Sequence, residues 1–189
     1  PDGRYPRATL QAIADECVAL LGDNFVCYGH DGLAKVVTDL LRAQHRTLAV
    51  AESCTGGFIA NRITAVPGAS RVFRGGVVAY HNEIKQSLLG VPEAILREHG
   101  AVSEPTARSM AEGARRALGV DYVLSVTGIA GPDGGTTDKP VGTVFIGLAS
   151  LQGTHVVKQF NPFDRETFKF VTSQQALNLL RRKLVGIPE

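Results

Sequence analysis

Ser53, Cys54 and Lys85 are the residues of this 189-residue chain whose types and surroundings could support nucleophilic catalysis. Ser53 and Cys54 follow a short apolar run, residues 48–51, and come just before a Gly-Gly pair. This order predicts a strand, a sharp turn and a helix, with backbone N–H groups and the positive helix end aimed at whatever binds beside Ser53. A serine hydroxyl is nearly inert until a base accepts its proton, so a partner is needed.

Lys85 is the best candidate for that base. The five histidines fall in no revealing spacing, and Gly56 stands where a Ser-x-x-Lys pair would have its lysine. Lys85 lies in the first turn of a helix expected just after Tyr80, where the macrodipole and apolar neighbours should lower its pKa. The alternative is that Ser53 only caps a helix that starts at Cys54, and that Lys85 is solvated surface.

Cys54 is a rival nucleophile, because a thiol at a helix N-terminus is acidified and attacks amides well. The residues alone do not choose between Ser53 and Cys54. A third interpretation makes Cys54 a small buried residue that packs the first turn of the helix, as most free cysteines do.

The elements that must position these groups alternate between strand and helix. Apolar periodicity predicts helices over residues 10–21 (with Thr9 as a possible cap), 33–41, 58–63, 82–89, 103–118 and 170–184. It predicts strands over residues 48–51, 75–80, 122–127, 141–150 and 154–160, with a short extended piece over 25–28. This pattern is typical of a three-layer α/β/α sandwich on a mixed, mostly parallel sheet.

Three of the predicted strands end at, or one turn before, a hydroxyl-bearing residue: Ser53, Tyr80 or Thr127. Ligands of such sheets usually lie beyond the carboxyl ends of the parallel strands. If the three strands are parallel, these three side chains share one crevice.

A long Gly-rich loop, residues 128–140, follows the third of these strands. Its backbone N–H groups could cradle a phosphate, with Lys139 as the counter-charge. The glycines assigned to this role are Gly128, Gly131, Gly134 and Gly135. The loop matches neither a Walker loop nor the dinucleotide-binding pattern. The alternative is a long surface connection.

Composition narrows the partners and the compartment. A net charge of +2, a pI near 8.6 and the absence of Trp make nucleic acid an unlikely partner. No apolar run approaches the roughly 20 residues that cross a bilayer, and no secretory signal opens the chain, so we expect a cytoplasmic protein. The three cysteines should be reduced thiols, and no paired Cys or His motif predicts a metal.

With these residues in place, the chain resembles the CinA carboxy-terminal domain family, the nicotinamide mononucleotide deamidases. The resemblance covers roughly residues 33 to 185 and rests on ordered motifs that are together far more specific than any one of them. They are residues 51–57 (AESCTGG), 64–70 (TAVPGAS), 76–85 (GVVAYHNEIK), 100–104 (GAVSE), 127–135 (TGIAGPDGG) and 139–143 (KPVGT).

The resemblance implies hydrolysis of the carboxamide of nicotinamide mononucleotide to nicotinic acid mononucleotide and ammonia, with no metal or cofactor. It favours serine over cysteine, so that Ser53 attacks and Lys85 is the general base. Tyr80 and Thr127 then orient groups or relay protons.

The oxyanion of the transition state needs hydrogen-bond donors as well. Our candidates are the backbone N–H groups of Thr55, Gly56 or Gly57, and each donor would contribute about 3 kcal/mol.

The resemblance also bears on organisation and partners. Residues 33–189 would form the amidohydrolase domain, and residues 1–32 resemble the connecting segment of longer, two-part CinA proteins. The first residue is Pro1 rather than Met, which fits a piece of something longer. The family implies a homodimer. A second hypothesis is a non-catalytic nucleotide-binding or assembly module. It is motivated by the segment of residues 1–32 and by family names that refer to competence and DNA damage.

Overall fold

The computed structural model describes residues 5–188 and divides the chain into two compact units, Pro1–Asp31 and Gly32–Glu189. The first unit contains helix α1 (Arg7–Leu21) and a 3-10 turn (Gly22–Asn24). Helix α1 starts after Pro6, earlier than expected, so Thr9 is not its cap. The extended piece expected over residues 25–28 forms no strand. That this unit connects to more chain stays a prediction.

The second unit contains six helices and five strands among the residues described. The helices are α2 (Leu33–Ala43), α3 (Phe58–Thr64), α4 (Asn82–Leu89), α5 (Glu93–His99), α6 (Glu104–Leu118) and α7 (Arg165–Leu184), and a 3-10 turn covers Ala69–Arg71. The strands are β1 (Leu48–Glu52), β2 (Phe73–Val78), β3 (Tyr122–Gly128), β4 (Thr143–Ser150) and β5 (Gly153–Phe160). The sequence analysis missed α5 and placed the start of α7 five residues too late.

The strands form one mixed sheet in the order β2-β1-β3-β4-β5. Strand β1 runs parallel to both of its neighbours, while β4 is antiparallel to β3 and β5. In this register Glu52 lies opposite Val78 on one side and Val126 on the other. The residues that follow these three positions therefore emerge side by side at one edge of the sheet.

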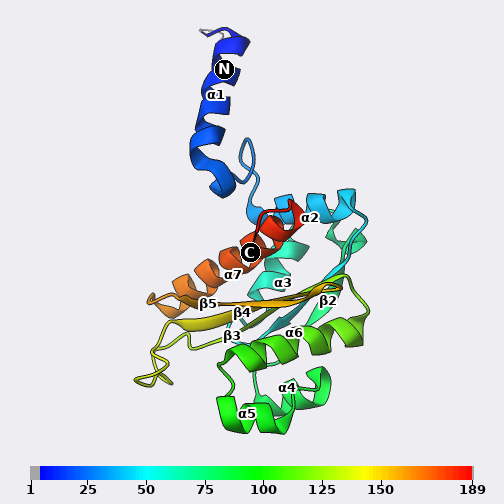
Figure 1. The fold of residues 1–189 in the computed structure, drawn as a ribbon, viewed down its shortest axis with the longest axis vertical. Coiled ribbons are helices and arrows are strands. Elements are labelled where there is room, and N and C mark those ends of the chain that lie inside the picture. The colour runs from blue at the N-terminus through cyan, green and yellow to red at the C-terminus, as the bar shows by residue number, and fades with distance from the viewer. Residues whose placement is uncertain (1–4, 189) are drawn as a thin grey trace. The chain divides into compact units, whose positions relative to one another are not determined.

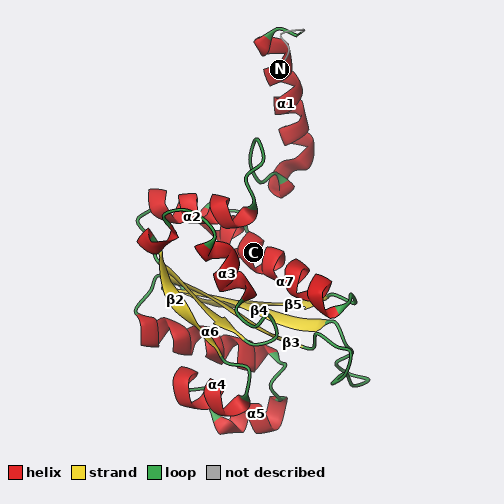
Figure 2. Cartoon of the chain, turned by 180° about the vertical axis from the view of Figure 1, so that it is seen from behind, coloured by secondary structure: helices red, strands yellow, loops and turns green. Residues whose placement is uncertain are grey.

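Helices cover both faces of the sheet, which confirms the predicted three-layer α/β/α sandwich (Figures 1 and 2). Helices α2, α3 and α7 lie on one face, and α6 lies on the other. Residues of β1 alternate between the two cores: Val50 belongs to the same core as Leu177, and Ala49 to the same core as Met110. Because β1 is buried on both faces, it reads as an apolar run rather than an alternating one.

Helices α4 and α5 form an outer tier that packs mainly against α6, on the side away from the sheet (Figures 1 and 2). The approach of α4 to α6 is very close at Gly113, where an added Cβ would lie 1.7 Å from the carbonyl oxygen of Leu89. Only glycine fits there, and the contact fixes the end of the helix that carries Lys85. Within residues 5–188, none of the helices is long and apolar enough to cross a bilayer.

Candidate active site

The four residues predicted to be catalytic line one cavity of about 180 Å³ at the carboxyl ends of β1, β2 and β3. They are Ser53, Tyr80, Lys85 and Thr127. Parallel pairing of the three strands brings the residues together, as the sequence pattern predicted.

Ser53 is anchored by its backbone and has a free hydroxyl. Its N–H donates to the Val126 carbonyl (2.9 Å), which extends the pairing of β1 with β3 by one residue. The side chain is 8% exposed, and its oxygen forms no hydrogen bond within residues 5–188. The turn that follows places Gly56 (φ 62°) and Gly57 (φ 94°) in the left-handed region, which side-chain-bearing residues rarely adopt. The turn therefore requires this Gly-Gly pair.

The amino end of α3 does not face the cavity, contrary to expectation. The carboxylate of Glu52, fully buried, accepts hydrogen bonds from the N–H groups of Gly57 (3.1 Å), Ile59 (3.1 Å) and Ala60 (2.9 Å). This carboxylate replaces the side-chain cap that α3 lacks and satisfies the first N–H groups of the helix. The helix end is thus neutralised from inside the protein rather than offered to a ligand.

This arrangement restricts the predicted oxyanion hole. The Gly57 N–H is bound to Glu52, and the Gly56 N–H donates to the Ser53 carbonyl (3.1 Å). Of the three candidates, the Thr55 N–H alone makes no hydrogen bond among the residues described. The Thr55 hydroxyl is also buried and unpartnered within that part of the chain.

Lys85 is buried and held by backbone carbonyls. It is only 1% exposed, and its Nζ donates to the carbonyl oxygens of Ala79 (2.9 Å) and Tyr80 (3.0 Å). Desolvation by burial lowers the pKa of its ammonium group. The alternative of a solvated Lys85 is therefore wrong. So is the alternative that Ser53 caps a helix at Cys54, because α3 begins at Phe58.

Lys85 Nζ can donate to both carbonyls whether it is charged or neutral, because an ammonium has three N–H donors and a neutral amine has two. In the neutral form, which burial favours, Ala79 and Tyr80 use both donors and leave the lone pair available. No hydrogen bond joins Lys85 Nζ and Ser53 Oγ in this structure. Catalytic hydrogen bonds are often long without substrate and tighten when it binds.

Cys54 is a poor nucleophile in this setting. Desolvation by burial raises the pKa of its thiol to about 12, and the nearby charge of Glu52 adds to that rise. Lys85 and Arg165 act in the opposite direction but do not offset it. The acidification expected at a helix N-terminus is absent because Glu52 occupies that end. The third interpretation, a small buried packing residue, describes Cys54 best.

Arg165, which the sequence analysis missed, connects two walls of the cavity. It donates to the Tyr80 hydroxyl (3.0 Å) and to the Gly131 carbonyl (2.8 Å), and it lines the cavity itself. Tyr80 is 60% exposed and stands at the entrance. The sequence offered no local signal for Arg165, because it lies before the apolar stretch from which the final helix was predicted.

Thr127 holds the opposite wall. Its hydroxyl donates to the Ala101 carbonyl (2.7 Å), in the segment between α5 and α6 that also lines the cavity. With its proton engaged there, the Thr127 oxygen is left as an acceptor toward the cavity.

The Gly-rich loop does not gather into one anion cradle. Gly128 lines the cavity, and Gly131 is joined to it through Arg165. Gly134 and Gly135 are exposed and lie outside the cavity lining. Lys139 donates to the His99 carbonyl at the end of α5 (2.7 Å). Lys139 thus ties the loop to α5, and Arg165 is the cation at the cavity.

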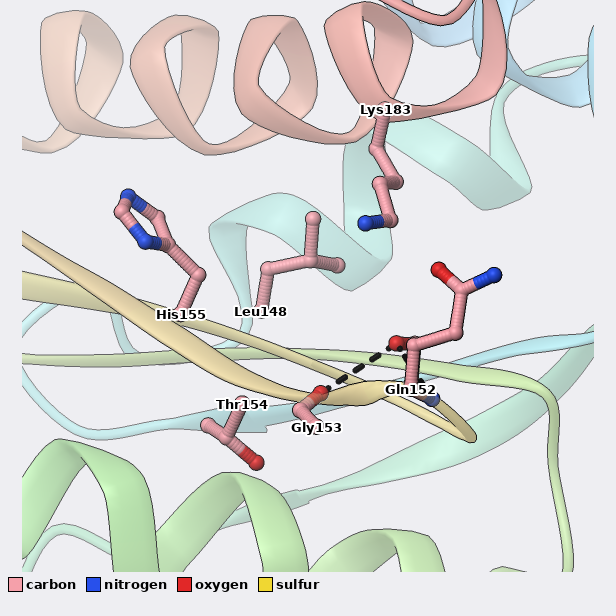
Figure 3. A pocket seen from close by; sticks show the side chains of 7 residues that line it. Leu148, Gln152, Gly153, Thr154, His155 and Lys183 are labelled. Atoms are coloured by element: carbon pink, nitrogen blue, oxygen red, sulfur yellow. Dashed lines mark hydrogen bonds between the residues drawn. The ribbon is translucent and has the colours of Figure 1, made fainter. Parts of the chain in front are cut away.

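A second pocket of about 240 Å³ lies at the turn between β4 and β5 and carries a different set of groups (Figure 3). Lys183 extends from α7 toward Gln152 on the turn, and His155 stands on β5. The Ser150 hydroxyl is engaged within the turn, donating to the Gly153 carbonyl (3.2 Å). This pocket lies away from the carboxyl ends of the parallel strands, so we assign the chemistry to the Ser53 cavity.

Fold and site together define a class: an α/β/α sandwich domain in which a hydroxyl at the end of a parallel strand and a buried amine on a flanking helix line one cavity. Comparison with known proteins places the chain within that class. The family model of the CinA C-terminal domain matches residues 30–184, and the chain belongs to this family.

Relatives and solved structures agree with that assignment. A CinA-like protein of Solibacter usitatus is 46% identical over 95% of this chain and 43% of its own length. One of Geobacter sulfurreducens is 52% identical over 87% of this chain and 40% of its own length. The chain thus spans less than half the length of these relatives.

Among solved structures, a competence-damaged protein (CinA) superfamily protein from Klebsiella pneumoniae has a TM-score of 0.79 and 30% identity, covering 82% of this chain and 96% of its own. A competence/damage inducible protein from Agrobacterium tumefaciens has a TM-score of 0.74 and 33% identity, covering 84% and 99%.

Proposed function

We propose that this chain is an amide hydrolase that converts nicotinamide mononucleotide to nicotinic acid mononucleotide and ammonia through an acyl-enzyme on Ser53. The observation that carries the proposal is the burial of Lys85 in the same cavity as Ser53, where desolvation favours the neutral amine and two backbone carbonyls hold its Nζ. Such an amine is a base at a pH where an exposed lysine is not.

The reaction would proceed in two halves. The Ser53 oxygen attacks the carboxamide carbon while the Ser53 hydroxyl proton passes to Lys85. The oxyanion that forms accepts a hydrogen bond from the Thr55 N–H. The tetrahedral intermediate then loses its nitrogen, which takes a proton from the Lys85 ammonium and leaves as ammonia. Water next attacks the ester, giving its proton to Lys85, and the carboxylic acid is released with Ser53 restored.

The substrate's phosphate is assigned to Arg165 in this proposal. A guanidinium group binds phosphate through two parallel hydrogen bonds, and Arg165 is exposed at the cavity. On binding, it would exchange its contacts with Tyr80 and Gly131 for the phosphate oxygens.

Ammonia release from nicotinamide mononucleotide tests the activity. Ser53→Ala and Lys85→Met should each abolish turnover, while Ser87→Ala, an exposed serine on the same helix as Lys85, should keep the wild-type rate. Mass spectrometry of rapidly quenched reactions should find the acyl adduct on the peptide with Ser53. Unchanged rates in both active-site variants would sink the proposal.

The non-catalytic nucleotide-binding or assembly module remains the second candidate. It is favoured by the separate unit at residues 1–31 and by the share of the longer relatives that this chain spans. Nucleotide binding without turnover by the intact chain would select it. The homodimer and the cytoplasmic location are further parts of our proposal. Sedimentation of the intact chain tests the homodimer, and the free cysteines fit a reducing compartment.

A further inference from the structure

A cavity of about 380 Å³ at the opposite edge of the sheet is lined by four arginines, and no step of the proposed reaction uses it. Arg42 and Arg46 approach it from the end of α2 and the segment before β1. Arg71 approaches it from the end of the 3-10 turn and Arg74 from the start of β2. The five residues of β1 separate this cavity from Ser53. At roughly 3.3 Å per residue, that distance is about 16 Å, so the two cavities are distinct.

The charges in this arginine cavity are only half compensated. Arg42 pairs with Asp39 (3.0 Å), which Lys35 also binds, and Arg46 pairs with Asp121 (2.9 Å). The two remaining cations, Arg71 and Arg74, are exposed.

Neither Arg71 nor Arg74 forms an ion pair with any residue among 5–188. Two positive charges therefore face solvent from a concave surface without a partner. A dianion would complement them.

One local feature indicates that the cavity leaves a donor without a partner. The Nε of Arg42 is buried and makes no hydrogen bond within the described residues, although most buried donors are bonded. His45, which also lines the cavity, has φ 53° because it ends α2 in a left-handed C-terminal cap, in which the Arg46 N–H donates to the Leu41 carbonyl (2.9 Å). The backbone of His45 is therefore explained by the helix end and is no evidence for a ligand.

We propose that the arginine cavity is a second binding site, for a small ligand that carries two or more phosphate charges. Guanidinium groups match phosphate oxygens in geometry and charge. The lining contains no Phe, Tyr or Trp, and four of its seven residues are arginines, so recognition is directed at the phosphates. The hollow shape and the mild net charge of +2 favour a compact anion over a nucleic acid.

Calorimetric titration of the intact chain with inorganic pyrophosphate tests this site. Arg71→Gln/Arg74→Gln should weaken binding roughly tenfold or more, because both partnerless cations are lost. The matched control is Arg97→Gln/Arg116→Gln, two exposed arginines on α5 and α6, which should bind as the wild type does. Equal thermal transitions in the two double variants would establish that each is folded.

Three results would overturn the proposal. One is the absence of measurable binding by the wild type at millimolar pyrophosphate, and another is an equal loss in the control variant. The third is binding that survives Arg71→Gln/Arg74→Gln but disappears in Arg165→Gln, because it would assign the anion to the Ser53 cavity. ADP should bind about as well as pyrophosphate. If a single-stranded oligonucleotide binds far more tightly than pyrophosphate, with a steep salt dependence, the ligand of this site is a nucleic acid and not a small anion.

Discussion

Replacing Glu52 with glutamine should disorganise the turn that presents Ser53, although the Glu52 side chain does not itself line the cavity. The carboxylate accepts three backbone N–H groups through two oxygens. A glutamine amide has a single oxygen, and its NH2 group can only donate. If the amide oxygen keeps Gly57 and Ile59, the NH2 group must face the N–H of Ala60.

The cost can be worked from these contacts. One charge-assisted hydrogen bond is lost outright, worth about 1.5–3 kcal/mol, and one buried donor is left unmatched. The two bonds that remain lose their charge and about half of their strength. These losses are partly offset because a neutral amide costs less to bury than a carboxylate. We therefore expect Glu52→Gln to lower the free energy of unfolding by roughly 2–4 kcal/mol, and Glu52→Ala to lower it further by adding a cavity.

Urea denaturation and the ammonia assay together measure this effect. In the folded Glu52→Gln variant, kcat for nicotinamide mononucleotide should fall more than KM changes, because the turn shapes attack rather than binding. Glu52→Asp should restore part of the stability if its shorter carboxylate still reaches α3. A glutamine variant as stable and as active as the wild type would refute the reasoning.

Three other predictions concern single residues. The pKa of Lys85 lies below the ordinary 10.5, and only the neutral amine accepts a proton. The rate of ammonia release should therefore rise as the pH increases through this lowered pKa. A rate that falls with pH over the same range would contradict the role of Lys85 as the base. Thr55→Val removes a buried, unpartnered hydroxyl and should raise the free energy of unfolding in urea by about 1 kcal/mol, and a loss of stability would mean that the hydroxyl is satisfied. Gly113→Ala should lower the free energy of unfolding by about 1–3 kcal/mol, because the added Cβ collides with the Leu89 carbonyl. The melting temperature and the rate of ammonia release should both fall. An unchanged rate would show that α4 shifts without moving Lys85.

The layered fold was predictable because its central strands and flanking helices have clear periodicities. Residues 48–51 read as a strand buried on both faces, and residues 33–41 as an amphipathic helix, and both elements form. Helix α5 was missed because it has only seven residues between Pro92 and Gly100 and buries none of them fully. The first three residues of α7 are polar and exposed, so apolar periodicity begins only at Phe168.

The cavity was predictable only in outline. Residues at the ends of parallel strands meet by topology, so the gathering of Ser53, Tyr80 and Thr127 followed from strand order alone. The roles of Glu52 and Arg165 depend on tertiary contacts that no local pattern encodes. From the sequence, Glu52 is only the polar residue that ends an apolar run. Its role as the cap of α3 is visible only in the folded structure, where its carboxylate accepts the N–H groups of that helix.

Because α4 lies in an outer layer, the helix that carries Lys85 can unfold locally while the sheet that carries Ser53 stays folded. Ser53 stands on a central strand, whereas Lys85 belongs to a helix that packs mainly on another helix. Elements with less buried contact open at lower free energy than the central sheet. Amide hydrogen exchange should therefore find α4 opening before β1, and low urea concentrations should abolish turnover while the sheet is still intact. The lifetime of the active form is then set by the docking of one helix rather than by the stability of the domain.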